Sequence, residues 1–211
     1  MRRFLALAVV LLISACASST AAVTGPADVA VQSKDVPGSL TRCDGSGDMD
    51  TFLNVIKTKD PSTYNQTKTE WDDAKSHGAT SAQVVFFADS KDHCTTIQAA
   101  GNNDLGSATY PLVINFVVKF KDSATAQDGY TNQSIFGFSE SSLTASGGAG
   151  VVKGKDTGLT PNSIALTVAI GSQSFYFAVW QNQAFMVILG VLNIGLDDSK
   201  KLASTVNGRI R

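Results

Sequence analysis

The chain has 211 residues, of which 43% are hydrophobic and 17% are charged, and its formal net charge at pH 7 is −1. This length accommodates one ordinary domain with a short additional segment. Lysines and arginines form no run in the sequence, which argues against a nucleic-acid partner and against a polybasic contact with a membrane.

Residues 1–15 have the pattern of an export signal. Arg2 and Arg3 form a positive start, and residues 4–13 are uncharged and mostly apolar. A membrane-spanning helix needs about 20 apolar residues, and this run ends sooner, at Ser14 and Ala15. We therefore predict a signal peptide that is removed on export.

The end of this signal resembles the lipobox of bacterial lipoproteins. Leu12 and Ile13 are aliphatic, Ser14 and Ala15 are small, and Cys16 follows them. The resemblance implies that a diacylglyceryl group is attached to the Cys16 thiol, that the chain is cut before Cys16, and that acyl chains such as palmitate anchor the protein. It places the protein in the cell envelope, on the outer face of the cell membrane, or at the outer membrane where the envelope has two. The alternative is an ordinary secretory signal with a chance cysteine.

Residues 16–39 are predicted to form a flexible tether. The segment is small and polar and contains Pro26 and Pro37, so it has too little apolar surface to order itself. The folded extracytoplasmic domain is therefore expected to occupy residues 40–211.

Two cysteines remain once Cys16 is assigned to the lipid. In an oxidising envelope, Cys43 and Cys94 are most simply paired as a disulfide. The alternative is a metal or thiol site that combines Cys94 with His93 and His77. Adjacent residues make awkward joint ligands, and the chain has no C-x-x-C or H-x-x-x-H spacing, so we predict the disulfide.

Helical patterns occur at both ends of the domain and between its strands. The first apolar stripe follows the i, i+3, i+4, i+7 spacing, with Ser46 or Asp48 as the cap: Met49, Phe52, Leu53 and Ile56. A second helix is predicted from Ser62 to about His77. Residues 89–101 predict a short helix or turn, residues 122–130 a short helix, and residues 197–207 a C-terminal helix.

Strand patterns account for most of the remaining domain. Residues 83–88 form a short apolar run, and residues 112–120 and 163–170 alternate with a period of two. Residues 174–192 read as a hairpin around a polar turn at 181–183. The sequence thus predicts a single α+β domain, with an antiparallel sheet of about five strands and helices packed on one face.

Catalytic motifs are incomplete in this chain. Residues 137–141 start like a nucleophile elbow but lack its last glycine, and both histidines precede Ser139, the reverse of the hydrolase order. The glycine-rich stretch at 149–156 lacks the first glycine and the hydroxyl residue of a phosphate loop. We therefore expect a protein that is not an enzyme and that carries no cofactor and no metal.

Two features remain as candidates for binding. Tyr176 and Trp180 share one face of the hairpin and are amphipathic, so they are expected to line a groove for an apolar or glycan-like ligand, unless helices or a loop cover that face. Residues 139–162 are rich in Ser, Gly and Thr and form a lid, a binding loop or a disordered segment.

The sequence favours a membrane-anchored lipoprotein whose domain binds a small molecule or an envelope protein. A structural or accessory envelope protein is the alternative, and an envelope hydrolase comes after it. A cleft with convergent polar groups would favour the hydrolase, whereas a flat exposed apolar patch would favour the accessory protein.

Overall fold

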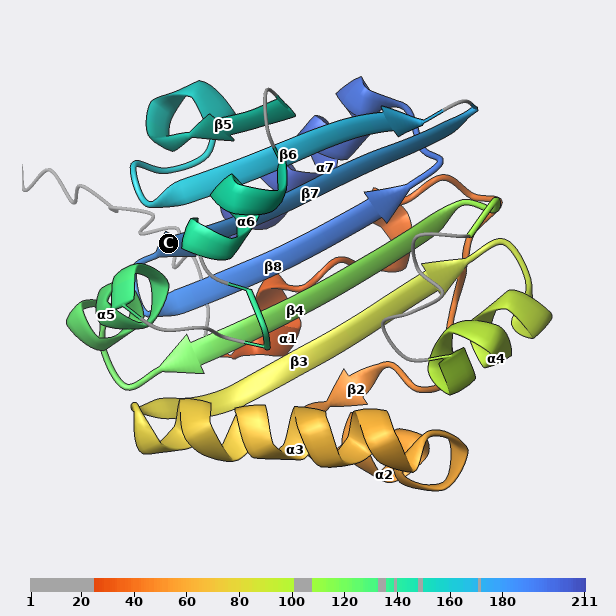
Figure 1. The fold of residues 1–211 in the computed structure, drawn as a ribbon, viewed down its shortest axis with the longest axis horizontal. Coiled ribbons are helices and arrows are strands. Elements are labelled where there is room, and N and C mark those ends of the chain that lie inside the picture. Colours follow the sequence, from red (N-terminus) through yellow and green to blue (C-terminus); the bar gives the residue numbers. More distant parts are fainter. Residues whose placement is uncertain (1–24, 101–107, 133–135, 139, 148–149, 171) are drawn as a thin grey trace, which may run out of the picture.

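An antiparallel sheet runs through the centre of the computed structural model, which describes residues 25–100, 108–132, 136–138, 140–147, 150–170 and 172–211 (Figure 1). The five long strands are the ones that the sequence predicts: β3 (Ala79–Ala88), β4 (Leu112–Phe120), β6 (Ser163–Ile170), β7 (Gln173–Asn182) and β8 (Phe185–Leu192). Short strands bring the described sheet to eight: β1 (Thr41–Arg42), β2 (Gly47–Asp48) and β5 (Val151–Lys153). The expected number of about five is too low because such short strands show no alternation in the sequence.

The sheet pairs strands from both halves of the chain. Its order is β1-β3-β4-β8-β7-β6-β5, with β2 also paired to β3, and all these pairs are antiparallel. β7 and β8 form the expected hairpin, but β7 extends to Asn182 and β8 begins at Phe185, so that the turn lies at Gln183 and Ala184. Because β4 lies beside β8, the centre of the sheet depends on contacts between distant parts of the sequence.

Helices cover both faces of the sheet, which corrects the expectation of helices on one face. One face carries α2 (Met49–Lys59), α3 (Pro61–Ser76), α4 (Lys91–Ala100), α5 (Ser123–Asn132) and α6 (Glu140–Gly147), which are drawn in front in Figure 1. The other face carries α1 (Pro26–Val29) and α7 (Leu196–Asn207), drawn behind. Every residue of β8 is buried, so both faces of this central strand are apolar and both need a cover.

Capping carboxylates set the starts of α2 and α3. Asp48 accepts a hydrogen bond from the backbone N–H of Thr51 at 2.8 Å, and this bond lowers the pKa of Asp48. Asp60 accepts one from the backbone N–H of Thr63 at 3.1 Å, and Pro61 begins α3. Asp48, and not Ser46, is therefore the cap of α2. The predicted apolar stripe of α2 is buried as expected: Met49, Phe52, Leu53 and Ile56.

Residues 25–39 of the expected tether, residues 16–39, belong to the fold, which the structure describes from Gly25. This part contains α1 and the 3-10 turn η1 (Ser33–Asp35), and Val29 and Val31 are 0% and 2% exposed. The backbone N–H of Val31 donates to Oδ1 of Asn115 at 3.0 Å, and Asn115 is fully buried in the sheet. Residues 25–35 thus form a short apolar strap that packs on the second face of the sheet, although small residues and prolines make this pattern hard to recognise in the sequence.

Near the C-terminus, Arg209 holds this strap in place. One guanidinium nitrogen donates to the backbone carbonyl of Ala30 at 2.8 Å, and the other donates to Oδ1 of Asp35 at 2.5 Å. The side chains of Arg209 and Asp35 are only 17% and 5% exposed. A largely buried ion pair therefore joins the beginning of the described chain to its end.

Most of the segment 139–162 lies in described structure. It contains α6, β5 and the 3-10 turn η5 (Gly154–Thr157), and Leu143 of α6 is buried. Nζ of Lys153 lies 2.8 Å from Oε1 of Glu140, which links β5 to the start of α6. Burial, together with the charge of Glu140, raises the pKa of Tyr130 on α5 well above its usual value. These contacts hold α6 over the front face of the sheet.

Candidate functional site

A cavity of about 670 Å³ lies over the middle of the sheet, on the face that carries α2 to α6. Its floor consists of side chains from the five long strands, and its walls come from α2, α3, α4, α6 and residues 136–138. In Figure 1 this is the region in front of β4 and β8, between α2 and α3 on one side and α6 on the other. The volume falls within the roughly 300–1,000 Å³ of small-molecule sites.

One row of paired residues crosses the floor of the cavity, in the order Phe86, Ile114, Gly190, Phe177 and Leu166. Residues directly opposite one another in antiparallel strands point to the same face, so all of these positions face the cavity. Gly190 is the central member and adds no side chain. The floor is therefore deepest at the middle of the sheet.

Packing alone does not require glycine at position 190. A Cβ built there would lie 3.7 Å from Cδ2 of Phe177 and 4.0 Å from Cβ of Ile114, which are ordinary van der Waals contacts. Glycine in a strand interior costs about 0.5–1 kcal/mol relative to alanine. Gly190 thus leaves space open at the cavity floor and lowers the stability of the strand.

Phenylalanine dominates the lining of the cavity: Phe52, Phe86, Phe116, Phe136, Phe138, Phe175 and Phe177. The rings contact one another across different elements. Phe116 and Phe136 have ring centroids 5.2 Å apart, and Phe138 and Phe177 have theirs 4.6 Å apart. Such a surface suits a ligand with an apolar body, because it offers a large area and few hydrogen-bonding groups.

The backbone at residues 136–138 brings two of these rings over the sheet. Phe136 has φ 51° and Gly137 has φ 77°, so two consecutive residues adopt left-handed backbone angles. For Phe136 this conformation is strained, and strained residues cluster at ligand-binding and active sites. The indole of Trp71 stacks on Phe136 at 6.4 Å between centroids, which holds the strained residue against α3.

Polar side chains of α3 form one end of the cavity. Thr63, Gln66, Thr67 and Glu70 follow helical spacing and all line it. Nε2 of Gln66 donates to Oε1 of Glu70 at 3.0 Å. Thr67 is 8% exposed, and its hydroxyl has no hydrogen-bond partner among the described residues. This end offers acceptors and a hydroxyl to a ligand.

The opposite end has polar residues that are occupied by the protein itself. Nδ2 of Asn193 donates to the carbonyls of Ala108 and Tyr110, and Oδ1 of Asn193 accepts from the backbone N–H of Ser174. Nε2 of Gln173 also donates to the carbonyl of Ala108, at 3.1 Å. These side chains secure the ends of β7 and β8.

Tyr176 and Trp180 do not lie at this cavity. Both point to the other face of β7, in the core beneath α7, and they are 3% and 0% exposed. Burial raises the pKa of Tyr176 to about 12, and Nε1 of Trp180 has no hydrogen-bond partner within the described part of the chain. Their neighbours Phe175 and Phe177 line the cavity instead. The alternation of the hairpin separates these two sets, but it does not tell which face of the sheet carries the cavity.

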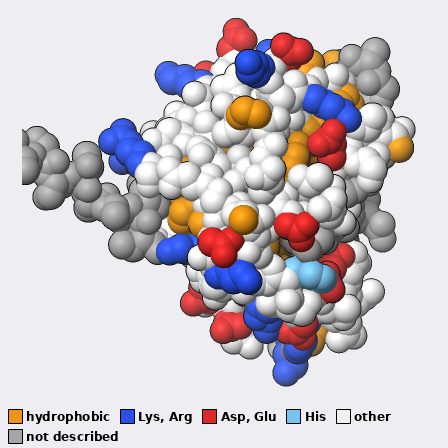
Figure 2. Space-filling model, turned by 90° about the vertical axis from the view of Figure 1, so that its left-hand side faces the viewer, with side chains coloured by type: hydrophobic (Ala, Val, Ile, Leu, Met, Phe, Trp, Pro, Cys, Tyr) orange, Lys and Arg blue, Asp and Glu red, His pale blue; other side chains and the backbone are white. Residues whose placement is uncertain are grey.

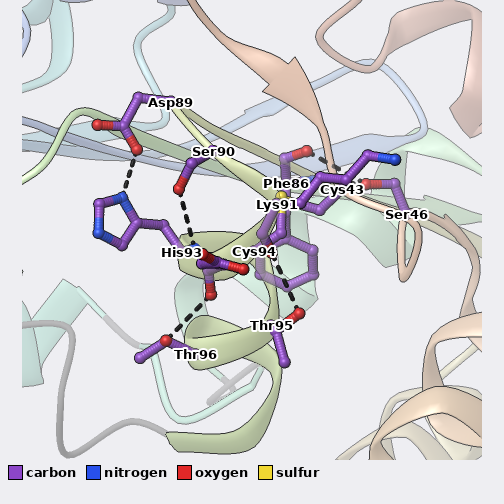
Figure 3. Close-up of a disulfide and its surroundings, with 11 residues drawn as sticks. Cys43, Ser46, Phe86, Asp89, Ser90, Lys91, His93, Cys94, Thr95 and Thr96 are labelled. Atoms are coloured by element: carbon purple, nitrogen blue, oxygen red, sulfur yellow. Dashed lines mark hydrogen bonds and ion pairs between the residues drawn. A yellow bond between two sulfur atoms is a disulfide. The ribbon is translucent and has the colours of Figure 1, made fainter.

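The predicted disulfide between Cys43 and Cys94 is present (Figure 3). It joins the segment between β1 and β2 to α4, over a sequence separation of 51. The backbone N–H of Cys43 donates to the carbonyl of Phe86 at 2.9 Å, so the bond lies beside the cavity floor. Cys94 has its sulfur in this bond and is therefore not a thiolate ligand of the alternative metal or thiol site. The ring of His93 stacks on Tyr110, with 3.7 Å between the ring centroids.

Charges of both signs are mixed on the end of the molecule seen in Figure 2, where apolar side chains form only small separate spots. Among the described residues, the exposed large hydrophobic side chains are Val152 and Leu196, on different elements. None of the described helices has the length and apolar character that crossing a membrane requires. Residues 1–15 and Cys16 lie outside the described residues, and lipid attachment stays a prediction.

Comparison with known proteins assigns no family to the chain. No family model matches it, and no curated protein matches it significantly. The extracellular domain of PknH from Mycobacterium tuberculosis has a similar structure, with 14% sequence identity over 87% of this chain and 93% of that chain and a TM-score of 0.47.

Proposed function

We propose that this protein is an envelope lipoprotein, held to a membrane through Cys16, whose folded domain binds an apolar small molecule over the centre of its sheet. The cavity of about 670 Å³ with its phenylalanine lining is the observation that carries the proposal. The lipobox-like residues 12–16 support the location. Binding is passive in this proposal, and no bond of the ligand is made or broken.

The composition of the lining favours binding over hydrolysis. Glu70 is the one ionisable side chain among the described residues that line the cavity. General acid–base chemistry needs a positioned acid and base near the reacting bond, and nucleophilic catalysis needs a nucleophile beside its base. The lining residues that the structure describes offer neither pair. A concave site also favours a small ligand over the flat contact of an accessory protein.

A neutral fluorescent probe tests the proposal. The full chain carrying Cys16→Ser, collected from the exported fraction, needs no detergent, which would itself compete for an apolar cavity. We expect N-phenyl-1-naphthylamine to bind saturably, with one probe per chain, and dodecanol to displace it. Absence of saturable binding, with the domain folded by circular dichroism, would refute the proposed function.

A further inference from the structure

The cavity is chemically asymmetric along its length. At the β7–β8 end, the amide of Asn193 uses both its oxygen and its nitrogen on backbone groups, and Nε2 of Gln173 is bound to the carbonyl of Ala108. At the α3 end, Gln66 and Glu70 bond to each other and Thr67 has no partner among the described residues. A polar group of a ligand therefore finds open hydrogen-bonding capacity at α3.

The α3 end of the cavity also carries an acidic group. Glu70 supplies the one ionisable group among the described lining residues, and an ionised carboxylate only accepts hydrogen bonds. Glu70 is partly exposed at the end of the cavity, and a like charge placed in contact with its carboxylate would be repelled by an interaction that salt can screen. A group with N–H or O–H donors and a positive charge would complement the site.

We propose that the ligand is a single-chain amphiphile whose apolar chain lies along the phenylalanine floor over Gly190 and whose donor head group, a cationic amine at best, bonds to Glu70 and Thr67. This proposal rests on the proposed function and adds the head-group chemistry to it. The expected order of affinity at equal chain length is amine, then alcohol, then carboxylate.

Competition titrations with three probes of equal chain length test this order. Each competitor, dodecylamine, dodecanol or dodecanoate, is titrated against N-phenyl-1-naphthylamine bound to the exported Cys16→Ser protein at neutral pH. A charge-assisted hydrogen bond predicts that dodecylamine binds at least about tenfold more tightly than dodecanoate. Raising the salt concentration should narrow this ratio and leave dodecanol unchanged.

Two variants of α3 test whether Glu70 causes the preference for the amine over the carboxylate. Glu70→Gln keeps the size of the side chain and removes its charge, so the ratio of amine to carboxylate should fall toward one while dodecanol binds as before. Asp72→Asn removes the same charge from the exposed side of α3, where Asp72 pairs with Lys68 and Lys75, and it should leave the ratio unchanged.

The outcomes separate the two proposals. Equal affinity for all three probes in the protein without an α3 substitution, or a preference that survives Glu70→Gln, overturns the head-group proposal and leaves the apolar site standing. Failure of dodecanol itself to bind overturns both. The ratio of amine to carboxylate affinity in the protein without an α3 substitution already tests the proposal, so the test does not depend on the folding of an α3 variant.

Discussion

Gly190→Leu tests the site with a change that the fold should accept. A Cβ at position 190 meets only ordinary contacts, with Phe177 at 3.7 Å and Ile114 at 4.0 Å, and the rest of the side chain extends into the cavity. Because glycine in a strand interior costs about 0.5–1 kcal/mol, the free energy of unfolding should stay the same or rise slightly. Stability and ligand affinity should therefore change independently.

The expected loss of affinity follows from the methylene groups that the new side chain displaces. A leucine at the centre of the floor takes the place of about three methylenes of a bound chain, each worth about 0.8 kcal/mol when buried. The loss is about 2.4 kcal/mol, or roughly 60-fold in Kd for dodecanol. Ligands that do not cross the floor would lose much less.

Probe displacement and thermal unfolding measure the two effects on the same samples. Gly38→Leu is the matched control, since no atom lies within 4 Å of a Cβ at that exposed position. An unchanged dodecanol affinity in a folded Gly190→Leu protein would show that the ligand does not lie over the centre of the sheet. A large drop in Tm would instead refute the reasoning that packing leaves room at Gly190.

Three further tests, each by substitution, address the anchor, the disulfide and the strap. Cys16→Ser should release the protein from membranes or leave an uncleaved precursor, and a fully processed membrane-bound product would contradict lipid attachment. Replacing Cys43 and Cys94 by alanine should lower the free energy of unfolding in urea by up to about 4 kcal/mol, the chain-entropy value for this loop, whereas an unchanged midpoint would contradict it. Arg209→Met leaves the buried carboxylate of Asp35 without its cation and should cost about 3 kcal/mol, and adding Asp35→Leu should recover part of that loss. Equal stability of the single variant and the parent would show that the ion pair is neutral.

Periodicity was enough to predict the parts of the fold that have a long repeating pattern. The alternation of residues 112–120 and 163–170 and the stripe of α2 correspond to β4, β6 and a buried helix face. The strap at 25–35 was missed because its buried residues are few and lie between prolines and polar residues. Its order comes from Asn115 and Arg209, which are far away in the sequence.

The site was less accessible to sequence reasoning than the fold. A cavity depends on which strand residues meet, and the row through Gly190 forms only when β4 and β8 pair across about 70 intervening residues. The hairpin pattern separated Phe177 from Trp180, but the face that stays open is decided by the placement of α1 and α7 on the other side. A lone glycine inside the apolar run 185–192 was the available signal, because such a glycine often marks a close approach or an open space.

The proposed attachment through Cys16 would give the strap a mechanical role. A pull on the N-terminal segment enters the domain at Gly25 and is met by Asn115 and Arg209, on the face of the sheet away from the cavity. The load is thereby shared between the C-terminal end and the centre of the sheet, because Asn115 belongs to β4 and its Nδ2 also donates to the carbonyl of Ile188 in β8. The strap and the strands of the cavity floor are thus mechanically connected through one buried side chain, Asn115.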